Sequence, residues 1–322
     1  FFELARGNLS KKSPSTNFGS FHPRPAISAF ARRGYFYAPV GLSKIGPVFR
    51  LVRLGNCLVA GATSLAGSWA ASQQLSRDKP WLLAVSAMLI AAFGNAYNDI
   101  CDLPADRVNR PDRVLVRGDL DVTTALRVAG WCLALGLMLA SYAYVDALII
   151  AVTVATVLFV YDRDLKSMPL VGNAAVGATC ATTVAYGALS GPSWNRQVVV
   201  LMVCAFSLTL VRELYKDIQD QEGDRAMGAR TFPILYGEFR SALVALLPLA
   251  FTIYFVLYRI FSSTPNWGGA YVAGVALTAG LVWTAVRSLS THGPRKWGIR
   301  SAEVKIWIIL GVVWVLLWRI PI

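Results

Sequence analysis

Charge is scarce in this sequence. Only 15% of the 322 residues are Asp, Glu, Lys or Arg, whereas 55% are hydrophobic. Soluble domains carry about 25% charged residues, so this chain has too little charge to cover a surface that faces water. The composition excludes an ordinary soluble domain and indicates a membrane protein.

Residues that bind soft metals are also scarce. His22 and His292 are the only histidines, and none of the five cysteines forms a Cys-x-x-Cys pair. Zinc sites and disulfide frameworks need Cys or His at recurring short spacings. The sequence therefore predicts neither, and we interpret the cysteines as small packing residues.

Long apolar runs dominate what is present. About nine of them approach the ~20 residues needed to cross a bilayer. They are continuous rather than alternating, which indicates helices and not the strands of a barrel. We predict an all-α polytopic bundle of about nine transmembrane helices, at 54–72, 81–98, 124–142, 146–161, 170–190, 197–212, 241–260, 268–287 and 304–320.

The basic residues follow the predicted topology. The formal net charge is +13, and most of the 31 Lys and Arg fall in alternate loops if the N-terminus lies inside. This skew is the positive-inside pattern of multispanning proteins. The positive charge therefore indicates topology and, in places, phosphate binding, rather than nucleic-acid binding.

Residues 1–50 differ in composition from the rest. They are rich in Ser, Arg and Pro, and Glu3 is their only acid. This is typical of an organellar transit segment, and a disordered cytoplasmic tail is the alternative. We predict a disordered tail over 1–50 and one membrane domain over 51–322, in a plastid or mitochondrial membrane if the tail is a transit segment.

One acidic segment follows the second predicted span. Asn98, Asp102 and Asp106 are spaced i, i+4, i+8, which places them on one helical face, and Asp99 stands beside Asn98. Pro104 should kink or end this helix, because its ring opposes the carbonyl of residue 100.

A second acidic segment follows the sixth predicted span. Asp217, Asp220 and Asp224 are spaced i, i+3, i+7, one turn after Glu213. Span counting places both segments on the inner side of the membrane. We therefore expect them to face one another across a single cavity at the membrane interface.

The charges of the two segments indicate a ligand. Stacked carboxylates repel one another and are costly near hydrocarbon. Basic residues accompany both segments: Arg107, Arg110, Arg113 and Arg117 follow the first, and Lys216, Arg225 and Arg230 interleave the second. Mg²⁺ that bridges the carboxylates to a diphosphate explains both sets of residues: the metal neutralises the acids, and the diphosphate neutralises the arginines and lysines. The alternative is that the arginines only set topology. We interpret Glu213 and Glu222 as structural ion-pair partners.

These residues resemble the motifs of a known family. Asn98-Asp99-x-x-Asp102-x-x-x-Asp106, followed by Asn109-Arg110-Pro111-Asp112-Arg113 and Gly118, resembles the first motif of the UbiA superfamily of intramembrane prenyltransferases. Lys216-Asp217-x-x-Asp220-x-Glu222-Gly223-Asp224, followed by Gly228 and Thr231-Phe232-Pro233, resembles the second. YDRDLKSMPLVGN at 161–173 and RLGN at 53–56 resemble further family elements. The motifs are most similar to the digeranylgeranylglyceryl phosphate synthase branch, with chlorophyll synthase and quinone-precursor prenyltransferases as competitors.

The resemblance implies a reaction and a set of site residues. A nucleophile on a lipophilic acceptor would attack the allylic carbon of a prenyl diphosphate (geranylgeranyl or similar) and release pyrophosphate, with Mg²⁺ as cofactor. The implied metal ligands are Asn98, Asp99, Asp102, Asp106, Asp217, Asp220 and Asp224, and the five from Asp102 onward are also the implied catalytic residues. The implied substrate-binding residues are Arg53, Asn56, Arg110, Arg113, Tyr161, Lys166 and Lys216. Tyr161 or Tyr97 would face the developing cation through its ring, unless it is a membrane-belt residue; Lys166 is alternatively a plain loop charge.

Other features leave alternatives open. Val114-Leu115-Val116-Arg117-Gly118 stands where the family usually has a Pro-x-Pro-Ser-Gly run, so the acceptor pocket is undefined. Small residues such as Gly67 and Gly187 either pack helices closely or line a groove for the prenyl tail. A transporter or a CDP-alcohol-type phosphotransferase also uses membrane acids. The nearly acid-free spans and the lack of a contiguous Asp-Gly-x-x-Ala-Arg motif argue against these two classes.

The predicted topology can be tested by labelling. Cysteine labels at 108–120, 164–168 and 290–300 should all react from one side of the membrane, and labels at 74–79, 192–196 and 263–267 from the other. The measurement is accessibility to a membrane-impermeant thiol reagent in sealed vesicles. Labels in the two acidic loops that react from opposite sides would contradict a shared site.

Overall fold

The computed structural model describes residues 44–72, 75, 78–192, 194–226, 228–262 and 268–317. Residues 1–43, which hold most of the predicted tail, lie outside the described residues. Residues 45–50 were predicted to be disordered, and this is wrong: they belong to helix α1 (Ile45–Leu51). This helix forms because Leu51 is fully buried against α3 and α5, next to Phe93 and Tyr97.

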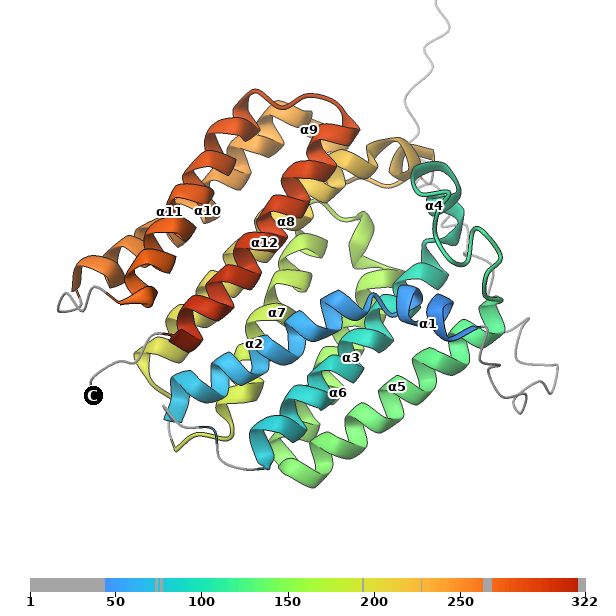
Figure 1. Cartoon of the computed structure of the whole chain (residues 1–322). Helices are drawn as coiled ribbons and strands as arrows, with labels where there is room; N and C mark the ends of the chain where they lie inside the picture. Colours follow the sequence, from blue (N-terminus) through green and yellow to red (C-terminus); the bar gives the residue numbers. More distant parts are fainter. Residues whose placement is uncertain are drawn as a thin grey trace, which may run out of the picture. The chain divides into compact units, whose positions relative to one another are not determined.

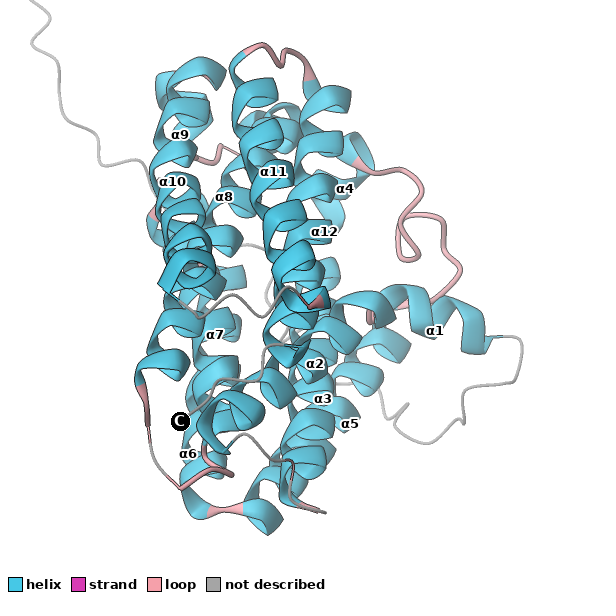
Figure 2. Cartoon of the chain, turned by 60° about the vertical axis from the view of Figure 1, so that its left-hand side comes forward, coloured by secondary structure: helices cyan, strands magenta, loops and turns pink. Residues whose placement is uncertain are grey.

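Nine long helices form the described part of the chain, with no strand in it (Figures 1 and 2). They are α2 (Leu54–Ser72), α3 (Lys79–Cys101), α5 (Val122–Ala143), α6 (Val145–Arg163), α7 (Val171–Ala188), α8 (Arg196–Ala226), α10 (Glu238–Ser262), α11 (Gly269–Leu289) and α12 (Pro294–Leu317). Three short elements connect them: α4 (Leu103–Asn109), η3 (Leu165–Ser167) and α9 (Phe232–Tyr236). The predicted all-α class is confirmed, and each predicted span overlaps one long helix. Residues 318–320 of the last predicted span lie outside the described residues.

Length and composition alone give a smaller number of spans. Among the described residues, six helices are long and apolar enough to cross a membrane, or seven if α1 and α2 count as one span bent by 57°. Helices α7 and α12 are not among them. α7 is rich in Gly and Thr, and α12 begins with a polar stretch that includes Arg295, Lys296 and Arg300. The number nine is therefore a count of long helices.

Helix boundaries position the acidic segments. α3 ends at Cys101 and Pro104 lies in the first turn of α4, so the chain turns at Asp102 as the proline predicts. α8 has 31 residues and continues well beyond the predicted end at 212. At 1.5 Å per residue it is about 46 Å long, which exceeds the ~30 Å hydrocarbon core of a bilayer. Its last turns can therefore carry the second acidic segment outside the hydrocarbon.

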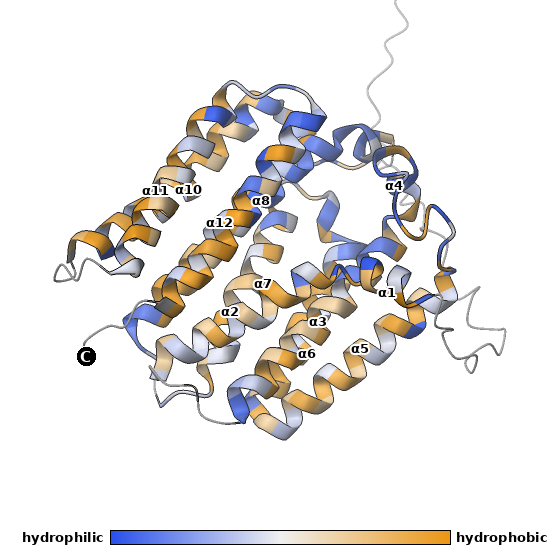
Figure 3. Ribbon diagram, viewed as in Figure 1, coloured by the Kyte–Doolittle hydropathy of each residue, from blue (hydrophilic) through white to orange (hydrophobic). Residues whose placement is uncertain are grey.

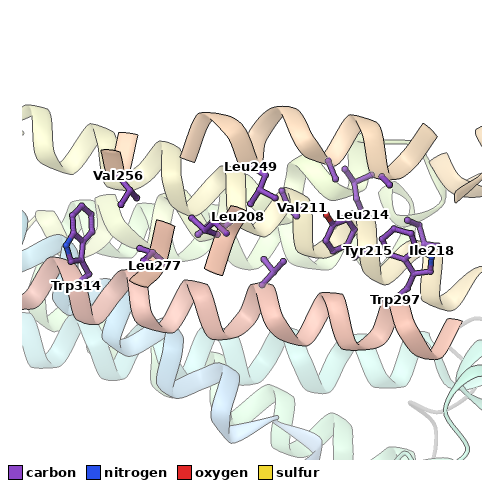
Figure 4. Packing of buried hydrophobic residues seen from close by; sticks show 14 of the residues in the cluster. Leu208, Val211, Leu214, Tyr215, Ile218, Leu249, Val256, Leu277, Trp297 and Trp314 are labelled. Atoms are coloured by element: carbon purple, nitrogen blue, oxygen red, sulfur yellow. The ribbon is translucent and has the colours of Figure 1, made fainter. Parts of the chain in front are cut away.

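One large core holds α8, α10, α11 and α12 together. Leu208, Val211, Leu214 and Ile218 form a buried stripe along α8 at i, i+3 and i+4 spacing (Figure 4). Tyr215 packs against Trp297 with ring centroids 5.1 Å apart. This packing fixes the end of α8 that carries the acids.

Small residues bring α2 and α7 into close contact. A Cβ atom at Gly67 would lie 2.0 Å from the Val184 carbonyl oxygen, and one at Gly187 would lie 1.7 Å from the Ser64 carbonyl oxygen. Ser68 Oγ also donates to the Gly187 carbonyl at 2.8 Å. Of the two roles considered for these glycines, the structure shows close helix packing.

Gly187→Ala should therefore destabilise the protein. Overpacking of this kind costs about 1–3 kcal/mol in free energy of unfolding. Gly130→Ala on α5 is the matched control, because a Cβ there meets nothing within 4 Å; it should be neutral or stabilising by up to about 1 kcal/mol. The measurement is thermal unfolding in detergent micelles, and equal melting temperatures for the two variants would contradict the packing role.

Candidate active site

The two acidic segments meet at the end of the bundle where α4 lies against α8 (Figure 1). Arg110 donates two hydrogen bonds from Nη2 to the Asp220 carboxylate, at 3.0 and 2.8 Å. Asn109 Nδ2 donates to the Asp220 carbonyl at 2.9 Å, and Gly223 N donates to Asn109 Oδ1 at 2.9 Å. The segments face each other, as the span count predicts. Hydrophilic residues gather at this end, around α4, while the helices are mostly hydrophobic (Figure 3).

A small polar pocket of about 10 Å³ lies between the two segments. Its volume corresponds to about one water-sized sphere. It is lined by four carboxylates (Asp102, Asp106, Asp220, Asp224), five cations (Arg53, Arg110, Arg113, Lys166, Lys216), Asn98, Asn109 and Ala105. Five of the seven predicted metal ligands are thus brought together: Asn98 and the four carboxylates.

Asp99 is not one of the lining residues. It is 2% exposed and lies between Arg53 and Arg113, and Arg113 Nη1 donates to Asp99 Oδ1 at 3.0 Å. Asp99 follows Asn98 by one residue, so it points about 100° away around the helix, toward the turn that carries Arg53. The structure thus gives Asp99 a different position from the predicted one: it orients two arginines of the pocket.

Asp217 also lies outside the polar pocket. Its Oδ2 accepts a hydrogen bond from Asn173 Nδ2 on α7 at 2.7 Å. Asp217 precedes Asp224 by two helical turns and is about 10 Å deeper in the bundle, where α7 packs against α8. Helical spacing places both residues on one face but does not place them at one depth.

Arg53 reaches the pocket from a strained turn. It lies between α1 and α2 with φ of 52°, a left-handed conformation that is uncommon for a residue with a side chain. Its Nη2 donates to Asn98 Oδ1 at 2.9 Å and pairs with Asp99. The turn therefore links the first helices to the end of α3.

The cations of the polar pocket neutralise its acids. Lys166 in η3 forms an ion pair with Asp102, and Arg110 forms one with Asp220. Burial alone would raise the pKa of Asp102, but the Lys166 ammonium outweighs burial and lowers this pKa below its ordinary value. Burial would lower the pKa of Lys166, and Asp102 raises it above its ordinary value. Both groups are therefore charged near neutral pH.

The loop between α4 and α5 is held by apolar residues. Val114 and Leu115, in the run that replaces the family's usual prolines, are buried with Leu120 in the cluster that contains Leu51 and Phe93. Burial of these side chains anchors the loop that carries Arg113, so apolar packing fixes this loop.

A larger cavity, the central cavity, adjoins the polar pocket. It has a volume of about 260 Å³ and shares Arg53, Asn98 and Lys216 with the polar pocket. Its deeper lining is mostly apolar and comes from α3, α6 and α7, including Ile90, Val154, Leu158 and Val176. Ile90 precedes Asn98 by eight residues, so this lining extends at least about 12 Å from the polar end.

All seven predicted substrate-binding residues line one of the two cavities. Asn56 and Tyr161 line the central cavity; Arg110, Arg113 and Lys166 line the polar pocket; Arg53 and Lys216 line both. Tyr97, the alternative to Tyr161, instead stacks between Phe93 and Phe159 and is 6% exposed. Of Tyr97 and Tyr161, it is therefore Tyr161 that lines the central cavity.

Four charged residues of the central cavity were missed or given another role. Asp162 accepts a hydrogen bond from Asn98 Nδ2 at 2.7 Å, and Arg212 and Lys305 also line the cavity. Glu213 pairs with Arg212 and Lys216, as predicted for a structural ion-pair partner.

Glu222 is exposed and forms no ion pair with another described residue, so its predicted pairing is wrong. Lys305 was detectable in the sequence as a cation within an apolar run.

The polar pocket suits a hard divalent cation. Among the described residues, no three His, Cys, Asp or Glu side chains are already arranged around a metal position. Two of the four carboxylates, Asp102 and Asp220, pair with Lys166 and Arg110. The pocket nevertheless offers only carboxylate and amide oxygens as ligands, and these are the donors that Mg²⁺ prefers. The donor chemistry of the site therefore fits Mg²⁺.

Fold and site together define a class: a helical membrane enzyme whose pocket for a charged group adjoins a mostly apolar cavity. The family comparison agrees, because the model of the UbiA prenyltransferase family matches residues 60–318. The chain belongs to this family and is a prenyltransferase. The alternatives of a transporter and a CDP-alcohol-type phosphotransferase are therefore wrong.

Relatives with known names agree with this assignment. The digeranylgeranylglyceryl phosphate synthase of Thermococcus kodakarensis is 32% identical over 264 residues, which cover 82% of this chain and 94% of that protein. The enzyme of the same name from Methanoregula boonei is 36% identical over 252 residues, which cover 76% and 87%. These relatives are archaeal and give no support to a plastid or mitochondrial location.

Solved structures share the fold. A structure from work on digeranylgeranylglyceryl phosphate synthase in membranes has a TM-score of 0.64 and 25% identity, covering 85% of this chain and 98% of that chain. A UbiA homolog from Archaeoglobus fulgidus bound to GPP and Mg²⁺ has a TM-score of 0.60 and 15% identity, covering 84% and 99%. The second likeness is one of fold alone.

The Lys166–Asp102 pair should be important for stability. Lys166→Met leaves Asp102 without its cation, and breaking a buried pair costs about 3 kcal/mol in free energy of unfolding. The double variant Lys166→Met/Asp102→Asn should recover most of this loss, because it removes the uncompensated charge. Unfolding in detergent micelles measures both, with Lys296→Met on the exposed face of α12 as control. A double variant no more stable than Lys166→Met would contradict the pairing.

Proposed function

We propose that the protein transfers a geranylgeranyl group from its diphosphate to an isoprenoid glyceryl phosphate within the membrane, with Mg²⁺ as cofactor, and releases pyrophosphate. One observation carries this proposal: a pocket with four carboxylates and five cations adjoins a mostly apolar cavity, and the two share lining residues. Such a site binds a substrate with an anionic head and an apolar tail. The names of the relatives support the geranylgeranyl group and the glyceryl phosphate acceptor.

The metal would bind in the polar pocket. Asn98, Asp102, Asp106, Asp220 and Asp224 would hold it, since they line this pocket and offer oxygen ligands. When bound, Mg²⁺ supplies positive charge that neutralises the diphosphate and assists its departure. Asp99 and Asp217 are not included, because they face Arg113 and Asn173 instead.

The basic residues of this pocket would bind the diphosphate oxygens. Lys166 pairs with Asp102, and Arg110 pairs with Asp220. If these carboxylates held Mg²⁺, Lys166 and Arg110 would be free to donate to the diphosphate oxygens. Arg113 and Lys216 add further donors, and Arg is suited to phosphate because of its planar fork of N–H groups.

The central cavity would hold the tail and protect the reacting carbon. Its apolar lining from α3, α6 and α7 excludes water, which would otherwise capture the allylic cation. Tyr161 lines the cavity near the shared residues, where its ring would face the developing positive charge. The acceptor hydroxyl would approach the allylic carbon at this junction.

The proposal is tested by turnover with defined substrates. Membranes supplied with geranylgeranyl diphosphate and Mg²⁺ should release pyrophosphate when given a geranylgeranylated glyceryl phosphate. They should release much less with an aromatic quinone precursor or a chlorophyll precursor. The prenylated product is identified by mass spectrometry, and transfer to the aromatic acceptor alone would refute the proposed acceptor.

Carboxylate variants test the shared catalytic centre. Asp102→Asn and Asp224→Asn keep the side-chain size and remove one charge each, and each should lower turnover by roughly 100-fold or more. The double variant should be scarcely worse than either single one, since residues that act as one unit are not additive. Asp217→Asn should be milder, and Glu222→Gln, which is exposed, should be close to wild type. Losses that simply multiply in the double variant would show two independent sites.

A further inference from the structure

The central cavity holds more positive charge than its own carboxylates neutralise. Of the described residues that line it, four are cations (Arg53, Arg212, Lys216, Lys305) and two are carboxylates (Asp162, Glu213). Unbalanced charge beside apolar helices is costly unless an ion of opposite charge binds there. The cavity is therefore built to accept an anion in addition to an apolar tail.

Lys305 is the clearest unbalanced charge. It projects from α12, within the apolar run predicted as the last span, and lines the cavity. Its Nζ donates to the Asn56 side-chain oxygen at 2.5 Å, and no carboxylate among the described residues forms an ion pair with it. The amide oxygen of Asn56 orients this ammonium group without neutralising it.

Arg212 is only partly neutralised. It lies one turn before Lys216 on α8, and both side chains pair with the same carboxylate, that of Glu213. Arg212 and Arg53 line the same cavity as Lys305. Cations from three parts of the chain thus gather where α12 contacts α2 and α8. Arg212 and Lys305 do not line the polar pocket, which has Arg110, Arg113 and Lys166 of its own.

We propose that Arg212 and Lys305, with Asn56, form a second anion-binding subsite, and that it binds the phosphate monoester of the prenyl acceptor. This inference rests on the proposed function and adds the residues that select the acceptor. Arg53 already pairs with Asp99, so the positive charge without a carboxylate of its own is that of Lys305 and, in part, that of Arg212. A phosphate monoester carries a charge of about −1.5 to −2 near neutral pH and would neutralise both groups. Arg53 and Lys216 line both cavities and lie between the two anions. An uncharged aromatic acceptor would leave the subsite unsatisfied.

Binding and kinetics of two variants test the subsite. Lys305→Met and Arg212→Gln should weaken binding of geranylgeranylglyceryl phosphate, measured in detergent without Mg²⁺ or donor, by about tenfold or more. They should raise the acceptor KM similarly while the donor KM stays within about twofold. Lys305→Arg should stay near wild type because it keeps the charge. Lys296→Met, an exposed lysine on the same helix, is the matched control.

A second binding measurement uses the acceptor without its phosphate group. Wild type should bind it weakly, and the two variants should bind it no worse than wild type does. Loss of a partly buried cation can affect folding, so the melting temperature of each variant is measured as well. Lys305→Gln keeps a donor for Asn56 and should show the same loss of phosphate-dependent binding.

Two results would overturn the subsite. Unchanged acceptor binding in folded Lys305→Met and Lys305→Gln would show that no acceptor phosphate binds there. An equal rise in the donor KM would assign these cations to the donor diphosphate instead. A wild-type protein that transfers the prenyl group to an uncharged acceptor but not to the phosphate-bearing one would refute the proposed function itself, which is a separate outcome.

Discussion

The site depends on charge neutralisation at the edge of an apolar bundle. A carboxylate or ammonium taken out of water loses several kcal/mol of solvation unless an opposite charge compensates it. Asp102 and Asp220 are neutralised by Lys166 and Arg110, which come from other segments of the chain. The contacts between α4, η3 and α8 are therefore the condition under which these acids can be buried at all.

Several features of the scaffold serve to bring the charges together. The chain turns at Asp102 because Pro104 starts a new helix, and the left-handed turn at Arg53 points a guanidinium at the end of α3. α8 is long enough to carry its acids beyond the hydrocarbon, and its apolar stripe fixes it against α10, α11 and α12. Elsewhere in the bundle, Gly67 and Gly187 allow close contact between α2 and α7. The apolar helices thus determine where the few charged residues lie.

The sequence predicts the long helices, because an apolar run can be read directly from neighbouring residues. It also predicts that the two acidic segments lie on the same side of the membrane, because an even number of spans separates them. It places the end of α8 too early, since a helix continues in polar residues once packing supports it. The resemblance to the family also implies Asp99 and Asp217 as metal ligands, whereas the structure pairs them with Arg113 and Asn173. A sequence motif reports neither the depth of a residue in the bundle nor its neighbours. Asn173, which binds Asp217, and Lys305, which lines the central cavity, come from distant segments. Only the folded arrangement shows these partners.

The ion pairs Lys166–Asp102 and Arg110–Asp220 bear on how the proposed substrates would bind. If a metal alone took the carboxylates, Lys166 and Arg110 would lose their partners, and if a diphosphate alone took the cations, the acids would be left uncompensated. Either step by itself would leave buried charge without a counter-charge, which costs about 3–5 kcal/mol for a single broken pair. A ligand pair that carries both signs of charge would satisfy both sets of groups. The ion pairs Lys166–Asp102 and Arg110–Asp220 therefore fit a site for a diphosphate together with a divalent cation better than a site for either one alone.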